Sequence, residues 1–140
     1  MKPPLYDSVH QMALDMVSAS EVGDTKLKWS IYQDIKALCE HNEGTDQDHP
    51  LQWEAFADFT SDDAVAMTLY ERALSIALQL NLPEYAASAL LAMAERNLDL
   101  GNIKIVIALA EKANSLALNS ENLDLRKEVN EFLLLVHEYQ

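Results

Sequence analysis

The chain contains only three glycines and four prolines among its 140 residues, and it is rich in alanine and leucine. Because glycine and proline are the residues least compatible with a helix interior, their scarcity predicts helix along nearly the whole chain. Gly23, Gly44, Pro50, Pro83 and Gly101 then mark turns. The pattern predicts an all-α protein with its helices in antiparallel succession.

Seven helices follow from the apolar stretches between these turns. We expect them at 5–21, 26–41, 51–59, 64–80, 84–100, 103–118 and 123–139. Six of them form three helix-turn-helix pairs, at about 5–41, 51–80 and 84–118, and the last is a C-terminal capping helix at 123–139. A chain of this length is expected to form one domain, 1–140, with a core that needs no metal or disulfide.

An internal repeat of about 40 residues supports this pairing. Residues 69–74 align with 109–114 at an offset of 40, and residues 54–60 align with 95–101 at an offset of 41. The aligned segments occupy the same place in successive helix pairs, and the change of offset falls in a turn. A period of this size is typical of helical repeat proteins.

The small residues of the repeat resemble those of the tetratricopeptide repeat family. The matching positions are Ala66, Tyr70, Ala73, Ala94, Leu100, Gly101, Asn102, Ala110 and Ala113. The resemblance covers about 51–122 and is closest to variants with repeats of about 40 residues. It implies a right-handed superhelix of three repeats that holds a peptide or a partner domain.

Apolar residues at helical spacing predict which helix faces are buried. In helix 64–80 the expected stripe is Ala66, Leu69, Tyr70, Ala73, Ala77 and Leu80. In the last helix Val129, Phe132, Leu133 and Val136 would face inward, and Arg126, Lys127, Glu128 and Glu131 outward, as in a cap. Alternatively, an apolar strip of Leu134, Leu135 and Tyr139 would pair with a second copy, so a monomer and a homodimer both remain open.

The charge excludes several classes of partner. Ten basic residues against 23 acidic ones leave a net charge of −13, which repels the phosphates of nucleic acids and anionic lipids. The single cysteine, Cys39, cannot form an internal disulfide, and no signal or membrane-spanning segment is apparent. We therefore expect a cytoplasmic protein that binds neither nucleic acid nor membrane.

The sequence contains no catalytic motif. Three dispersed glycines cannot form a phosphate-binding loop or a dinucleotide fingerprint. The residues nearest to a metal site are Cys39, His41, Asp46, Asp48 and His49, whose spacing matches no standard zinc motif. We expect a non-enzymatic protein without metal or cofactor; the alternative is an enzyme or metal protein that uses this loop.

Acidic residues are concentrated in the segment 40–63, which has eight of them and no lysine or arginine. Glu54 and Asp58 share a helix face, and Glu95 and Asp99 repeat that arrangement one unit later. The acidity serves either solubility or the docking of a basic protein. Under the second interpretation, the predicted partner-binding residues are Trp53, Glu54, Asp58, Asp62, Asp63, Glu95 and Asp99, although Trp53 is also a candidate core residue.

These observations favour a protein-protein interaction module that binds a basic partner through an acidic face. Segments 53–60 and 92–96 are similar to those of small helical proteins from bacterial toxin-immunity loci, which implies an immunity protein that neutralises a toxin domain. The alternative is a secretion chaperone, or a regulatory or scaffold protein that binds peptides.

Overall fold

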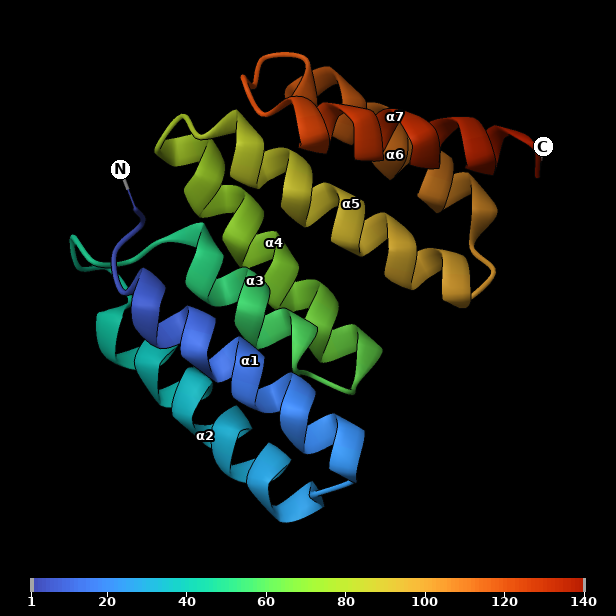
Figure 1. Ribbon diagram of the computed structural model, residues 1–140. Coiled ribbons are helices and arrows are strands. Elements are labelled where there is room, and N and C mark those ends of the chain that lie inside the picture. The colour runs from blue at the N-terminus through green and yellow to red at the C-terminus, as the bar shows by residue number, and fades with distance from the viewer. Residues whose placement is uncertain (1, 140) are drawn as a thin grey trace. The chain divides into compact units, whose positions relative to one another are not determined.

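The computed structural model describes residues 2–139, and within this range the secondary structure is entirely α-helical (Figure 1). The helices are α1 (Tyr6–Val22), α2 (Thr25–Asn42), α3 (Pro50–Asp58), α4 (Asp63–Gln79), α5 (Pro83–Asp99), α6 (Ile103–Ala117) and α7 (Leu123–His137). The all-α prediction is confirmed, and each helix end lies within two residues of its expected position. No helix in this part of the chain has the length and apolar character needed to span a membrane.

The chain divides into two compact units, residues 1–69 and 70–140. In the first unit α1 packs on α2 and α3, and α2 packs on α3. In the second unit α5 packs on α6, and α7 packs mainly on α6. Figure 1 shows a short turn between α1 and α2 and a longer loop, residues 43–49, between α2 and α3.

Three of the helices end in the same backbone motif. Gly23, Asn81 and Gly101 have φ angles of 70°, 55° and 79°, in the left-handed region. In each case the next amide donates to a carbonyl five residues earlier, as from Asn102 to Asn97 at 3.1 Å. This is the Schellman arrangement, which satisfies carbonyls at the helix end and reverses the chain.

Side chains also define where helices begin. The Asp24 carboxylate accepts from the Leu27 amide at 3.0 Å, and Asn122 caps α7 in the same way through Leu125. His49 caps α3. Proline occupies the first turn of α3 and of α5, where its missing amide hydrogen costs no helical bond. The turn chemistry read from the sequence therefore determines the helix boundaries.

The first unit has an aromatic and aliphatic core. Ile31, Ile35 and Cys39 on α2 face the buried side of α3, where Trp53 and Phe56 lie. One polar residue, Gln52, is fully buried among them. Its amide nitrogen donates to the carbonyls of residues 47 and 4, at 2.7 and 3.3 Å, whereas its side-chain oxygen accepts no hydrogen bond.

The second unit is built on small residues. Ala94, Val106, Ala110 and Val136 form a fully buried cluster from α5, α6 and α7. Five half-buried residues pack against it: Leu98, Ile107, Leu109, Phe132 and Leu133. On α7, residues 127, 128 and 131 are exposed and Arg126 is half-buried, which is the polar outer face expected of a cap. Leu134, Leu135 and Tyr139 are exposed as well.

The sequence repeat is accompanied by a repeat in burial. Ala66, Tyr70, Ala73 and Ala77 of α4 are buried, and so are the residues 40 positions later in α6. Of the predicted α4 stripe, Leu69 is only half-buried and Leu80 is 51% exposed. Leu80 does not belong to the stripe because α4 ends at Gln79, so its side chain leaves the helix face.

Candidate functional site

A pocket of the first unit has a volume of about 630 Å³ and lies where α1, α2 and the α3–α4 turn meet. We call it the Trp29 pocket. Its lining residues are Met16, Ser20, Thr25, Lys28, Trp29, Tyr32, Asp58, Phe59, Thr60, Ser61, Asp62 and Val65. Its volume falls within the range of about 300–1,000 Å³ that is typical of ligand sites.

An exposed tryptophan forms one wall of this pocket. Trp29 is 64% exposed, although an indole is one of the largest apolar side chains. Its ring stacks on Tyr32, with centroids 5.9 Å apart and planes 21° apart. Tyr32 in turn packs edge-to-face on buried Phe56 at 5.5 Å. The exposed indole is therefore supported by an aromatic series that reaches into the core.

Two acidic residues and one basic residue belong to the lining of the same pocket. Asp58 is the last residue of α3, and Asp62 precedes α4 and accepts a hydrogen bond from the Val65 amide at 3.0 Å. Lys28 is half-buried on α2 beside Trp29. The pocket thus combines an apolar wall with a net charge of −1, and its hydroxyl groups have no histidine among the lining residues to activate them.

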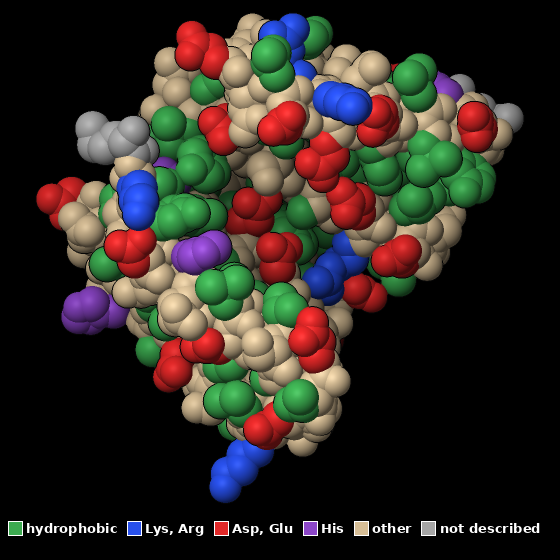
Figure 2. Space-filling model, viewed as in Figure 1, with side chains coloured by type: hydrophobic (Ala, Val, Ile, Leu, Met, Phe, Trp, Pro, Cys, Tyr) green, Lys and Arg blue, Asp and Glu red, His purple; other side chains and the backbone are tan. Residues whose placement is uncertain are grey.

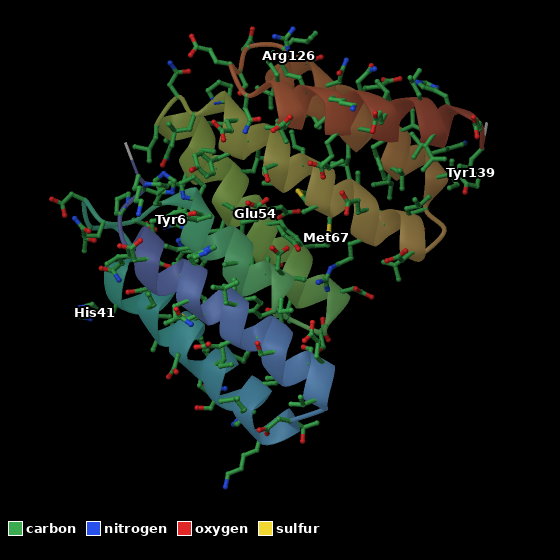
Figure 3. The ribbon with its side chains drawn as sticks, viewed as in Figure 1. Tyr6, His41, Glu54, Met67, Arg126 and Tyr139 are labelled. Carbon is green, nitrogen blue, oxygen red and sulfur yellow. The ribbon has the colours of Figure 1, made fainter. Side chains whose placement is uncertain are left out.

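The predicted partner-binding residues fall into separate places. Asp58 and Asp62 line the Trp29 pocket, and Asp63 is half-buried at the start of α4. Glu54 is half-buried on α3 (Figure 3). Glu95 and Asp99 are exposed on α5, in the second unit. The stripe that would join both pairs of acids remains a prediction.

Trp53 lies in the core of the first unit and is only 5% exposed. Its indole nitrogen donates to Asp48 Oδ1 at 2.7 Å, and the second oxygen of Asp48 accepts from the Gly44 amide at 2.9 Å. Gly44 has a φ of 78°, a backbone conformation that few other residues adopt. Trp53 therefore anchors the loop between α2 and α3, and its ring does not form part of the surface.

The other residues of that loop are separated from one another. His41 is exposed and points away from α2 (Figure 3). Cys39 is fully buried, and its thiol donates to the Gln52 carbonyl at 3.3 Å. Burial, and then the charges of Asp48, Glu40 and Glu43, raise the pKa of Cys39 to about 12. Since the thiolate is the nucleophile and the metal ligand, a thiol held neutral in this way is unsuited to both roles.

His49 acts as a helix cap. It is buried, and its Nδ1 accepts from the Leu51 amide at 3.1 Å. Burial lowers the pKa of His49, against a smaller opposing effect of Asp48, so the neutral ring is favoured. Among residues 2–139, no three His, Cys, Asp or Glu side chains lie close enough together to hold a metal ion.

Sequence reasoning missed Trp29, Tyr32 and Lys28. A signal was present, because the buried face of α2 runs through Ile31, Ile35 and Cys39 and Trp29 lies off that face. A tryptophan outside the apolar stripe of a helix is a candidate binding residue, because tryptophan is enriched at interfaces. Its partners in the pocket come from α1 and the α3–α4 turn, which no local pattern brings together.

Comparison with known proteins gives no assignment. No protein-family model matches the chain, and no curated protein or solved structure matches it significantly.

Proposed function

We propose that the protein is a non-enzymatic binding module that holds one basic partner protein through an acidic surface. In the most specific form of the proposal, it is a cytoplasmic immunity protein that occupies the basic cleft of a toxin domain. The helix pairs would continue into a right-handed superhelix of the tetratricopeptide type, with α7 as its cap.

The uneven distribution of charge carries the proposal. Residues 1–69 contain thirteen acidic and four basic residues, a net charge of −9, whereas residues 70–140 contain ten and six, a net charge of −4. Among the side chains visible in Figure 2, acidic ones are more frequent than basic ones. An excess of one sign accelerates association with a partner of the opposite sign and disfavours others.

Two exposed acidic residues occupy positions that do not favour their helices. Glu40 and Asp99 lie in the last turns of α2 and α5, where the helix dipole is negative. A negative charge there is unfavourable by about 0.3–1 kcal/mol. Solubility alone does not require this placement, because exposed positions elsewhere on the helices would serve equally well. The placement supports a role for the charge in binding.

The first experiment is affinity capture with the full chain as bait in lysate of the native host, washed at low and then high salt, with mass spectrometry of the eluates. We expect a single basic protein that is released by salt. A varied set of clients unaffected by salt would favour a chaperone or a peptide-binding protein instead.

Association kinetics of the purified pair then test the electrostatic mechanism. The triple variant Glu40→Gln, Glu43→Gln, Asp46→Asn neutralises three exposed acids of the first unit. Its association rate is expected to fall by about tenfold at low salt and to match the wild type at high salt. Glu121→Gln, Glu128→Gln, Glu138→Gln is the matched control in the second unit. If both triple variants slowed association equally, the rate would depend on the net charge of the whole protein and not on the acidic residues of the first unit.

A further inference from the structure

We infer that the Trp29 pocket binds an arginine side chain of the partner. The inference rests on the proposed function, since it identifies the group that a basic protein would insert. The pocket is formed entirely by residues of the first unit, where the excess of negative charge is greatest.

Two features of the lining fit a guanidinium group. The exposed Trp29 ring offers a flat aromatic face, on which a guanidinium stacks while its edge remains free to donate hydrogen bonds. Asp58 and Asp62 lie in the same lining and contribute two negative charges, against one positive charge from Lys28. Arginine combines a planar cation with forked donors, whereas the ammonium of lysine is compact and strongly hydrated. The pocket therefore favours arginine.

The aromatic wall is also held in place before any partner arrives. Tyr32 is half-buried between Trp29 and Phe56, and both ring contacts are within 6 Å. A rigid aromatic side chain loses little conformational entropy on binding, which is why tryptophan is enriched among the residues that dominate interface energies. An exposed but supported indole is suited to that role.

Replacing Lys28 should change the binding affinity in the opposite direction to replacing either aspartate. Lys28 is one of the lining residues, and its positive charge repels a bound cation, so its removal should strengthen binding while the removal of either aspartate weakens it. A purely apolar occupant would respond in neither direction.

The chain has two tryptophans, which makes the measurement selective. N-acetyl-arginine amide is titrated into the ¹⁵N-labelled full-length protein, and both indole N–H resonances are followed. We expect a saturable shift of the Trp29 resonance only, because the Trp53 indole is buried and bonded to Asp48. N-acetyl-lysine amide and N-acetyl-norleucine amide serve as comparison probes and should bind more weakly.

Variants connect the shift to the pocket. Asp58→Asn and Asp62→Asn should each raise the dissociation constant about two- to fivefold, and Lys28→Gln should lower it by a similar factor. Asn retains the capping acceptor at position 62. Glu128→Gln, an exposed change on α7, should leave the constant unchanged. An unaltered Trp53 resonance shows that each variant is folded.

Three results would overturn the inference: no saturable shift of Trp29, equal binding of the three probes, or a Trp29 resonance that depends on protein concentration and not on arginine, which would indicate a second copy in the pocket. None of these contradicts the proposed function. That function fails separately if no basic partner is captured, or if association is independent of salt.

Discussion

Residues 70–140 bury nine alanines, whereas residues 1–69 bury only three and fill their core with Trp53, Phe56 and the isoleucines of α2. Small side chains allow helix axes to approach closely, so little space remains between the helices of the second unit. A pocket of the second unit, at the α4–α5 turn and the end of α6, has a volume of about 340 Å³ and no charged residue in its lining. The first unit has bulkier side chains, and its pocket is larger and carries charge.

The two units also differ in the kind of side chain that packing leaves at the surface. In the second unit the repeated burial pattern of α6 is continued by α7, and the apolar residues that remain exposed, such as Ile105, Leu134 and Leu135, are mostly aliphatic. In the first unit, Trp29 and two aspartates remain at the surface after the core is complete. Residues that the packing does not use are where a binding function is expected.

The largest expected effect is the loss of the aromatic core in the first unit. Phe56→Ala should lower the free energy of unfolding by about 3–5 kcal/mol, because it removes a buried ring that supports both Trp53 and Tyr32. Urea denaturation measures the change. Val17→Ala, at an exposed site on α1, is the control and should cost less than about 0.5 kcal/mol. A loss for Phe56→Ala no larger than that of the control would show that the aromatic series is not structural.

In the second unit, stability should be most sensitive to the replacement of a small buried side chain by a larger one. Ala110→Leu inserts three carbons into a fully buried site on α6 and should cost about 1–3 kcal/mol. Ala108 is exposed on the same helix, so Ala108→Leu is the matched control and should be close to neutral. Thermal unfolding of the two variants tests the prediction. Similar melting temperatures would mean that the small residues are not required for close packing.

The cap of α4 should contribute a smaller amount. Asp62→Ala removes the acceptor for the Val65 amide and should cost about 0.5–2 kcal/mol, whereas Asp62→Asn retains it. Chemical denaturation of the three proteins at pH 7 separates the cap from the charge. If Asn and Ala were equally destabilising, the charge and not the hydrogen bond would be responsible.

The smallest effect is the pH dependence from His49. Because burial lowers its pKa in the folded state, the unfolded state binds the proton more readily. The contribution to stability is therefore fully present above pH 6.5, the ordinary value, and is lost as pH falls through the lower folded-state pKa. His49→Asn retains a capping group and should show a shallower loss between pH 7.5 and 5. Parallel stability curves for the two proteins would contradict this assignment.

The sequence predicted the helices well because their ends are determined locally. Gly23 and Gly101 adopt the left-handed conformation that ends a helix, and Pro50 and Pro83 begin the next ones. Leu80 was misassigned because one residue beyond a helix end is enough to turn a side chain to solvent. Boundaries of this kind are visible in the sequence only to within a residue or two.

The candidate site was less predictable from the sequence. Asp58 and Asp62 stood out by charge, but Trp29 reaches them only because α2 packs against α3. Trp53 belongs to the same acidic segment and yet lies in the core, since Asp48 accepts its indole hydrogen. Tertiary packing determines which of the two tryptophans remains exposed. The hydrophobic periodicity of a single helix cannot predict this, because it does not show which helices become neighbours.

The buried amide of Gln52 has a consequence for the order in which the first unit assembles. Its bond to residue 4 joins positions that are 48 residues apart in the chain. Contacts across long chain separations form slowly, because a large loop must close before they are gained. The N-terminal segment is therefore expected to dock late during folding and to detach first during local unfolding. The nearby Cys39 thiol donates to the Gln52 carbonyl. Its rate of alkylation would therefore measure how often the segment detaches.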